Sequence, residues 1–221
     1  MALKIINTSD GSHTLFNENL NETYHSIHGS IEESNHVYIN AGLKNKIEVN
    51  NNLSVLEIGL GTGLNFLLLY KYLEGNNNQI SYHTLEPYPI ERSLLNKLNY
   101  PSLIGGESEE VFKLIHESED EKNVRVNNKI IFRKSIKTIE SIKLYSDSYD
   151  LVFFDAFAPS KQPEIWSNKN LTKIYKSMKD ESILVTYSSS KKFKEILYDI
   201  GFKVEVLKGS KGKREMVRAL K

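Results

Sequence analysis

The sequence predicts an α/β protein with a doubly wound, mostly parallel β-sheet. Short apolar runs of strand length alternate with amphipathic stretches of helix length from residue 53 onwards. This alternation favours a parallel sheet, because each helix returns the chain to the edge where the next strand begins. The last two apolar runs are separated only by residues 208–215, a segment too short for a crossover helix. We therefore expect seven strands, parallel except for a C-terminal antiparallel hairpin.

The first strand and the first helix follow from residues 53–58 and 62–73. The run 53–58 is apolar and ends at Gly59, as a buried parallel strand does. In the stretch 62–73, Leu64 and Leu68 lie on one apolar stripe of a helix. The other predicted strands are residues 80–85, 129–132, 149–154, 182–187, 204–207 and 216–220, and the other predicted helices are 89–98, 191–199 and one around 111–115.

The N-terminal part of the chain has a different character from the rest. Residues 1–50 show no strong period, but the Ser-Asp-Gly-Ser turn signal at 9–12 predicts a hairpin. Residues 18–43 are polar, and we expect turns and short helices there. We therefore predict a small hairpin and cover segment at 1–50 and one main domain at 51–221, with a polar insertion at 101–128.

Composition and charge restrict the class of protein. The 221 residues are 39% hydrophobic and 26% charged, as in ordinary globular domains, and cysteine is absent. With no signal peptide and no membrane-spanning apolar run, we expect a cytoplasmic protein without membrane contact. The net charge is only +1, but basic residues gather at 203–221 and acidic residues at 107–121. An anionic partner is therefore expected at the C-terminal end.

A glycine loop joins the first strand to the first helix. Gly59, Gly61 and Gly63 allow the backbone to bend there and a ligand to approach closely. A dinucleotide fingerprint requires a third glycine where this chain has Leu64. The loop is therefore typical of a Rossmann-like nucleoside site rather than of a nicotinamide dinucleotide site.

Two acidic residues near this loop indicate the nature of the ligand. Glu57 precedes the loop and suits a cation rather than a diphosphate. Glu86 ends the second strand, where an acid is placed to bind both ribose hydroxyls. S-adenosylmethionine is a nucleoside with a sulfonium and an ammonium and no phosphate. It is therefore the predicted cofactor, and a parallel sheet with a C-terminal antiparallel hairpin is the arrangement of class I methyltransferases.

The fourth predicted strand leads into the most specific motif of the chain. Residues 155–166 contain Asp-Ala-Phe-Ala-Pro followed by Pro-x-x-Trp, and this segment resembles the signature of the MnmC-like (MnmD) tRNA methyltransferases. Segments 57–66, 24–32, 36–39 and 208–216 are similar as well. The resemblance runs from about residue 24 to the C-terminus.

The resemblance implies methyl transfer from S-adenosylmethionine to the primary amine of 5-aminomethyl-2-thiouridine at the tRNA wobble position. The anticodon arm would be the partner. Many members of the family carry a fused flavin-dependent oxidoreductase, for which 221 residues leave no room. We therefore expect this chain to transfer methyl groups only and to carry no flavin. The chain departs from the family at its usual Gly-Asp pair, where Ser135 ends the corresponding stretch.

Asp155 is the predicted catalytic residue, because it lies at the carboxyl edge of the sheet, where open α/β sheets bind ligands. The amine must be neutral to attack, and Asp155 is the candidate to accept its proton or to orient it. The predicted cofactor-binding residues are Glu57, Gly59, Gly61, Gly63, Glu86, Pro87, Ser135, Asp155 and Ala156. The predicted substrate-binding residues are Tyr24, Phe157 and Trp166, which would stack on the uridine or its neighbours, and Lys161, Lys213 and Arg214, which would contact phosphates.

Two other interpretations of the sequence stay open. The six histidines show no metal-binding spacing, so we expect no metal site in this chain. In the first, the chain methylates a small molecule or a protein. In the second, it is a non-catalytic nucleotide-binding scaffold. The basic C-terminal hairpin and the Asp155 motif favour tRNA over both.

Overall fold

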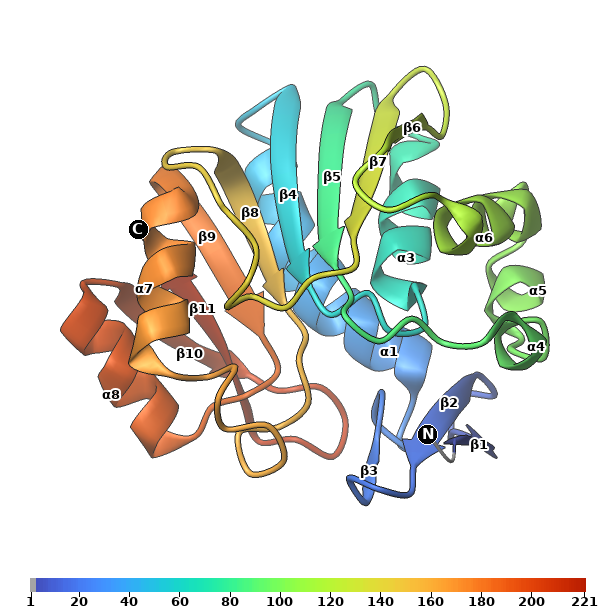
Figure 1. The fold of residues 1–221 in the computed structure, drawn as a ribbon, viewed down its shortest axis with the longest axis horizontal. Coiled ribbons are helices and arrows are strands. Elements are labelled where there is room, and N and C mark those ends of the chain that lie inside the picture. The colour runs from blue at the N-terminus through green and yellow to red at the C-terminus, as the bar shows by residue number, and fades with distance from the viewer. Residues whose placement is uncertain (1–2) are drawn as a thin grey trace.

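The computed structural model describes residues 3–221, so the first two residues of the predicted N-terminal segment lie outside the described part. The main sheet has eight strands in the order β10-β11-β9-β8-β4-β5-β7-β6 (Figure 1). Strands β4, β5, β7, β8 and β9 are parallel, and β11 is antiparallel to both β9 and β10. The predicted α/β fold with its C-terminal hairpin is therefore confirmed. The strands are β4 (Asn52–Ile58), β5 (Gln79–Leu85), β6 (Asn123–Arg125), β7 (Ile130–Ser135), β8 (Tyr149–Phe154), β9 (Met178–Thr186), β10 (Lys203–Lys208) and β11 (Glu215–Leu220).

The sheet contains one strand more than the seven predicted. Strand β6 pairs antiparallel with β7 at the edge of the sheet. It is short, and Val124 is its one apolar residue, so no apolar run reveals it. The predicted insertion 101–128 is thus largely regular structure, with α5 (Tyr100–Ile104), α6 (Ser108–Glu117) and β6.

The helices of the main domain follow the predictions at three places and depart from them at three others, one of which is α5. Helices α3 (Leu64–Leu73), α6 and α8 (Lys191–Ile200) lie where helices are predicted, and Gly201 ends α8 in the left-handed conformation. The helix predicted at 89–98 is reduced to the single turn α4 (Arg92–Leu95). Helix α7 (Asn168–Ser177) has no predicted counterpart, because most of its residues are polar.

The N-terminal residues form a small sheet and then a helix. Strands β1 (Leu3–Asn7), β2 (His13–Asn17) and β3 (Glu22–Thr23) are antiparallel, which confirms the hairpin predicted at 9–12. Where turns and short helices are predicted, the chain instead runs as one helix through α1 (Ser30–Ser34), the π-helix η1 (Asn35–Leu43) and α2 (Lys44–Ile47). A π-helix shifts apolar residues away from the 3.6-residue period, so the period does not reveal it.

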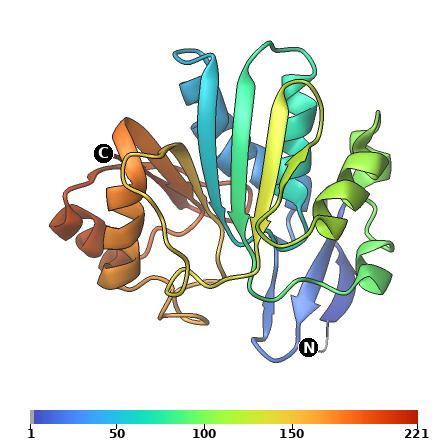
Figure 2. The same cartoon turned by 45° about the horizontal axis from the view of Figure 1, so that its top comes forward.

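Helices cover both faces of the sheet (Figures 1 and 2). The core consists of two clusters of buried apolar side chains, one on each face. Alternate residues of β8 supply the two layers: Leu151 and Phe153 pack with η1 and α3, and Val152 and Phe154 pack with α7 and α8. The carboxyl ends of β4 and β5 point toward the small sheet β1–β3 (Figure 1). Within residues 3–221, no helix has the length and apolar character needed to cross a bilayer.

Candidate active site

A cavity of about 830 Å³ lies at the carboxyl ends of β4, β5 and β8. Its floor includes Gly59, Glu86 and Asp155. Residues 19–27 of the N-terminal segment line it from another side, so the hairpin segment and the main sheet share this cavity. Open α/β sheets bind their ligands at this edge.

The glycine loop packs against Asp155 at the end of β8 and is hydrogen-bonded to Glu86 at the end of β5. Gly59 has a φ of 92°, and a Cβ placed on it would lie 2.6 Å from the carbonyl oxygen of Asp155. The N–H of Gly61 donates to Oε2 of Glu86 at 2.8 Å, and the N–H of Tyr88 donates to Oε1 at 2.9 Å. Gly63 does not line the cavity. It faces α6 instead, where a Cβ on Gly63 would meet the His116 ring. Of the three glycines predicted to bind the cofactor, Gly59 and Gly61 face the cavity.

Asp155 lies in the cavity with both carboxylate oxygens hydrogen-bonded. The hydroxyl of Tyr38 donates to Oδ1 at 2.6 Å, and Nδ2 of Asn65 donates to Oδ2 at 2.7 Å. Burial raises the pKa of Asp155 to about 6, against these two hydrogen bonds, which lower it. A carboxylate with this pKa is ionised at neutral pH and still able to accept a proton, as a general base must be.

Tyr38 and Asn65 are functional candidates that sequence reasoning missed. Tyr38 lies in η1, and Asn65 lies in the first turn of α3, where it also donates to Glu57 at 3.1 Å. Asn65 lies two residues after the glycine loop and is the one polar residue in the apolar run 64–69, a pattern that indicates a functional side chain. Tyr38 lies 117 residues from Asp155, so no local pattern connects the two.

Tyr38→Phe is expected to move the acid limb of the kcat–pH profile upward by about one pH unit. The substitution removes a hydrogen bond that lowers the pKa of Asp155, so its proton is held at higher pH. Because the ionised form accepts the proton, kcat falls as the pH drops through this pKa. Tyr70→Phe is the control, since it removes a tyrosine–carboxylate hydrogen bond to Glu107 outside the cavity. An unshifted acid limb in Tyr38→Phe would contradict this role.

Glu57 is placed differently from its predicted role. It is fully buried, does not line the cavity, and accepts hydrogen bonds from Asn65 and from the Thr84 hydroxyl at 2.9 Å. Burial and the charge of Asp155 raise the pKa of Glu57 to about 8, against hydrogen bonds from Thr84 and Asn65. Glu57 is thus mostly neutral at pH 7 and supports Asn65 from below, rather than meeting a cofactor cation.

Glu57→Gln is expected to flatten the pH dependence of stability. The folded-state pKa of Glu57 lies above its ordinary value of 4.5, so its contribution to stability is complete below pH 4.5 and is lost as the pH rises through about 8. The loss is on the order of a few kcal/mol. Urea unfolding from pH 5 to 9 measures it, with the exposed Glu48→Gln as control. Equal slopes for wild type and Glu57→Gln would refute the assignment.

Two of the three predicted aromatic residues lie together at the cavity. The rings of Tyr24 and Phe157 meet edge to face at 4.8 Å, and both residues line the cavity. Trp166 does not line it and is only 3% exposed. Its Nε1 donates to the carbonyl oxygen of Phe157 at 2.8 Å, and its ring packs against Phe154 and Phe193. The stacking role predicted for Trp166 is therefore wrong: it is a core residue that holds Phe157 in place.

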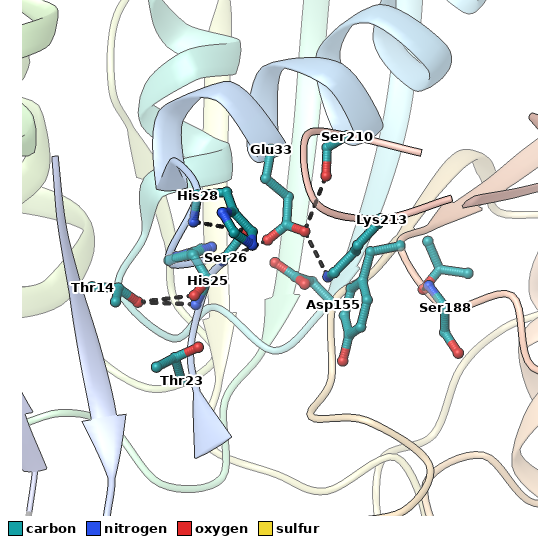
Figure 3. A network of polar contacts seen from close by, with 12 residues as sticks. Thr14, Thr23, His25, Ser26, His28, Glu33, Asp155, Ser188, Ser210 and Lys213 are labelled. Atoms are coloured by element: carbon teal, nitrogen blue, oxygen red, sulfur yellow. Dashed lines mark hydrogen bonds and ion pairs between the residues drawn. The ribbon is translucent and has the colours of Figure 1, made fainter. Parts of the chain in front are cut away.

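The three predicted phosphate contacts separate in the structure. Lys213 points into the site, where its Nζ lies 2.6 Å from Glu33 and 3.8 Å from the centre of the Tyr187 ring, and its contact with a phosphate stays a prediction (Figure 3). Arg214 is exposed and lines a second, shallower cavity of about 380 Å³. Lys161 is half-buried beside the Asp155 motif and lines neither cavity. Arg214 and Lys161 keep the positions expected for contacts with a polyanion.

Of the three remaining residues that are predicted to bind the cofactor, two line the cavity and one does not. Pro87 and Ala156 line the cavity. Ser135 does not: it is buried, and its hydroxyl contacts Nε2 of His83 at 2.8 Å and Oε1 of Glu121 at 3.2 Å. Its predicted contact with the cofactor is therefore corrected to a structural contact at the end of β7.

The cavity fits a cationic nucleoside better than a diphosphate. Six acidic residues of the described chain line it: Glu22, Glu33, Glu86, Glu140, Asp155 and Glu164. Among the described residues that line it, the lysines are Lys137 and Lys213, and each is paired with an acid. Burial lowers the pKa of His25 to about 4, so this residue is neutral and adds no cation. These carboxylates can accept hydrogen bonds from ribose hydroxyls and can pair with a sulfonium and an ammonium. Within residues 3–221, no group of three acidic or histidine side chains is arranged to hold a metal.

Comparison with known proteins agrees with this geometry. A family described as S-adenosyl-L-methionine-dependent methyltransferase matches residues 108–221. The tRNA 5-methylaminomethyl-2-thiouridine biosynthesis bifunctional protein MnmC of Leptospira interrogans is 30% identical over 217 residues, which cover 92% of this chain and 33% of that protein. The protein of the same name from Campylobacter hominis is 27% identical over 212 residues, covering 93% of this chain and 31% of that protein. The chain thus spans about a third of the length of these curated relatives.

A solved structure also resembles the whole chain. The crystal structure of MNMC2 from Aquifex aeolicus superposes with a TM-score of 0.82 at 25% identity, covering 99% of this chain and 70% of that one. The family match covers just over half of the 221 residues and includes the Asp155 motif and the C-terminal hairpin. The predicted cofactor, S-adenosylmethionine, is confirmed by the family. The chain therefore belongs to the S-adenosyl-L-methionine-dependent methyltransferases.

Proposed function

We propose that this chain transfers a methyl group from S-adenosylmethionine to the primary amine of 5-aminomethyl-2-thiouridine at the wobble position of tRNA. The names of the curated relatives support the product, and the likeness to MNMC2 extends over nearly the whole chain. The observation that carries the proposal is Asp155, a carboxylate held by Tyr38 and Asn65 inside the cofactor cavity. Such a group suits an amine nucleophile, which must lose a proton to react.

The cofactor supplies an activated methyl group on a sulfonium. The protein contributes position and a proton acceptor. The substrate amine arrives largely as an ammonium near neutral pH. The Asp155 carboxylate pairs with this ammonium and accepts one of its protons, which frees the nitrogen lone pair. Attack by the neutral amine would form the N–C bond as the S–C bond breaks, leaving S-adenosylhomocysteine and a methylated ammonium, and the Asp155 carboxyl would then release its proton to solvent.

The side chains around Asp155 suit a uridine that has flipped out of the stacked anticodon loop. Tyr24 and Phe157 form an aromatic corner on the cavity wall, where a flipped uridine can pack. Lys161 and Arg214 lie outside the cavity and are the proposed contacts to phosphates of the anticodon arm. We also propose that residues 1–50 act as a cover over the methyltransferase domain 51–221.

The decisive experiment is mass analysis of wobble nucleosides after incubation with S-adenosylmethionine and hypomodified tRNA. The substrate tRNA comes from cells that make the aminomethyl group but cannot methylate it. We expect conversion of 5-aminomethyl-2-thiouridine to its methylaminomethyl form. The same tRNA digested with ribonuclease is the control, and equal turnover on the digest would eliminate the tRNA assignment.

The same assay separates the two alternatives. A small-molecule or protein methyltransferase would consume S-adenosylmethionine in a cell extract depleted of RNA. A scaffold would bind the cofactor and methylate neither tRNA nor extract. The Asp155 site favours an enzyme over a scaffold, because Tyr38 and Asn65 hold its carboxylate at the wall of the cavity, where it can meet an amine.

A further inference from the structure

An ion pair lies inside the cavity and has no part in the mechanism described so far. Oε1 of Glu33 and Nζ of Lys213 are 2.6 Å apart, and both residues line the cavity. Glu33 belongs to α1 and is only 5% exposed, and Lys213 belongs to the loop between β10 and β11. The pair therefore joins two ends of the chain beside Asp155 (Figure 3).

The surroundings hold both charges in place. The N–H of Ser26 donates to Oε2 of Glu33 at 2.8 Å, and the Ser210 hydroxyl donates to Oε1 at 3.4 Å. Burial alone would raise the pKa of Glu33, but Lys213 and the Ser26 N–H outweigh it and lower the pKa, so Glu33 is anionic. The Lys213 ammonium lies over the Tyr187 ring, which leaves N–H donors of this group free for another partner.

This pair lies toward Asp155 rather than toward Glu86. Lys213 lies over the Tyr187 ring, whose hydroxyl donates to the carbonyl oxygen of Ala156 at 2.8 Å, directly after Asp155. The Glu86 carboxylate instead accepts from the N–H groups of Gly61 and Tyr88. Glu86 is the predicted ribose ligand, and Asp155 is proposed to deprotonate the amine that attacks the methyl group. A cofactor that spans both acids therefore places its amino-acid end beyond Asp155, where Glu33 and Lys213 lie.

We propose that the Glu33–Lys213 pair recognises the zwitterionic α-amino-acid end of S-adenosylmethionine. The Lys213 ammonium binds the α-carboxylate, and the Glu33 carboxylate binds the α-ammonium. Each charge of the amino-acid end thus meets an opposite charge of the protein. Of the two lysines that line the cavity among the described residues, Lys137 pairs with Glu121, which flanks β7 on the Glu86 side. Lys213 is accordingly the cation for the carboxylate. This inference rests on the cavity being the cofactor site.

The test measures binding by calorimetry with three probes. S-adenosylmethionine carries both charges of its amino-acid end, decarboxylated S-adenosylmethionine lacks only the carboxylate, and 5′-methylthioadenosine lacks the whole end. Lys213→Gln is expected to weaken S-adenosylmethionine about 10- to 100-fold, since a charge-assisted hydrogen bond is lost. The decarboxylated probe is expected to bind as well as to wild type or better, and 5′-methylthioadenosine to be unaffected. Lys211→Gln, an exposed change in the same loop, is the control.

Glu33→Gln tests the other half of the pair. It is expected to weaken S-adenosylmethionine and the decarboxylated probe alike, because both keep the ammonium, and to spare 5′-methylthioadenosine. If either single variant fails to fold with an unpaired buried charge, the double variant Glu33→Gln/Lys213→Met removes both charges together. It should bind 5′-methylthioadenosine normally and lose its preference for S-adenosylmethionine over the other two probes.

The outcomes distinguish this inference from the proposed function. If Lys213→Gln leaves S-adenosylmethionine binding unchanged, or weakens all three probes equally, the zwitterion site is wrong and the cofactor site stands. If the wild-type protein binds none of the three probes, the cofactor site itself is wrong.

Discussion

Asp155→Asn is expected to lower kcat on hypomodified tRNA by about a thousandfold or more. Asparagine keeps the shape of the side chain but accepts no proton and carries no charge to pair with the substrate ammonium. Affinity for S-adenosylmethionine should stay within about threefold, since the ribose and glycine-loop contacts are untouched. Single-turnover kinetics together with calorimetry separate the two effects.

The pH dependence provides a second measurement on the same variant. Wild-type kcat should fall as the pH drops below about 6, where Asp155 takes up its proton. The residual activity of Asp155→Asn should show no such limb, because the titrating group is gone. Asp180→Asn, an exposed change in β9, is the matched control. Wild-type activity in Asp155→Asn would mean that the carboxylate does not take part in methyl transfer.

Gly59→Ala is expected to abolish measurable cofactor binding, a loss of about 100-fold or more, and to lower the free energy of unfolding by about 2–4 kcal/mol. The new Cβ would lie 2.6 Å from the carbonyl oxygen of Asp155, at a φ of 92° that side chains avoid. Neither neighbour can yield easily, because the N–H of Gly59 donates to Leu85 at 2.9 Å and the N–H of Asp155 donates to Ile58 at 3.0 Å. The turn therefore has to distort.

The control for this prediction is Gly75→Ala at the other end of α3. A Cβ at Gly75 meets nothing within 4 Å, and its backbone is not in the left-handed region. Calorimetry and urea unfolding on both variants measure the difference. If Gly59→Ala bound S-adenosylmethionine as tightly as Gly75→Ala, the close packing of the loop against β8 would have no functional consequence.

The parts of the site that the sequence predicts are those in which chemistry and chain neighbours coincide. Strand β4, the glycine loop and α3 form one continuous segment, so its apolar pattern and its glycines describe it completely. Asp155 follows β8 directly, and a residue at a strand end is placed by the strand itself. Where a pattern is weak, as in η1, α7 and β6, packing against the sheet rather than local preference determines the element.

The sequence by itself determined the α/β class, the C-terminal hairpin, the cofactor and the residues that end strands: Glu86, Asp155 and the glycine loop. Only the tertiary structure decided which way the long side chains point. It placed Trp166 in the core, Glu57 beneath the cavity and Lys213 inside it, and it brought Tyr38 to Asp155 from a distant helix. The physical reason is that periodicity and turn chemistry are local, whereas the partner of a buried polar group is set by whichever distant segment the fold brings within hydrogen-bonding distance.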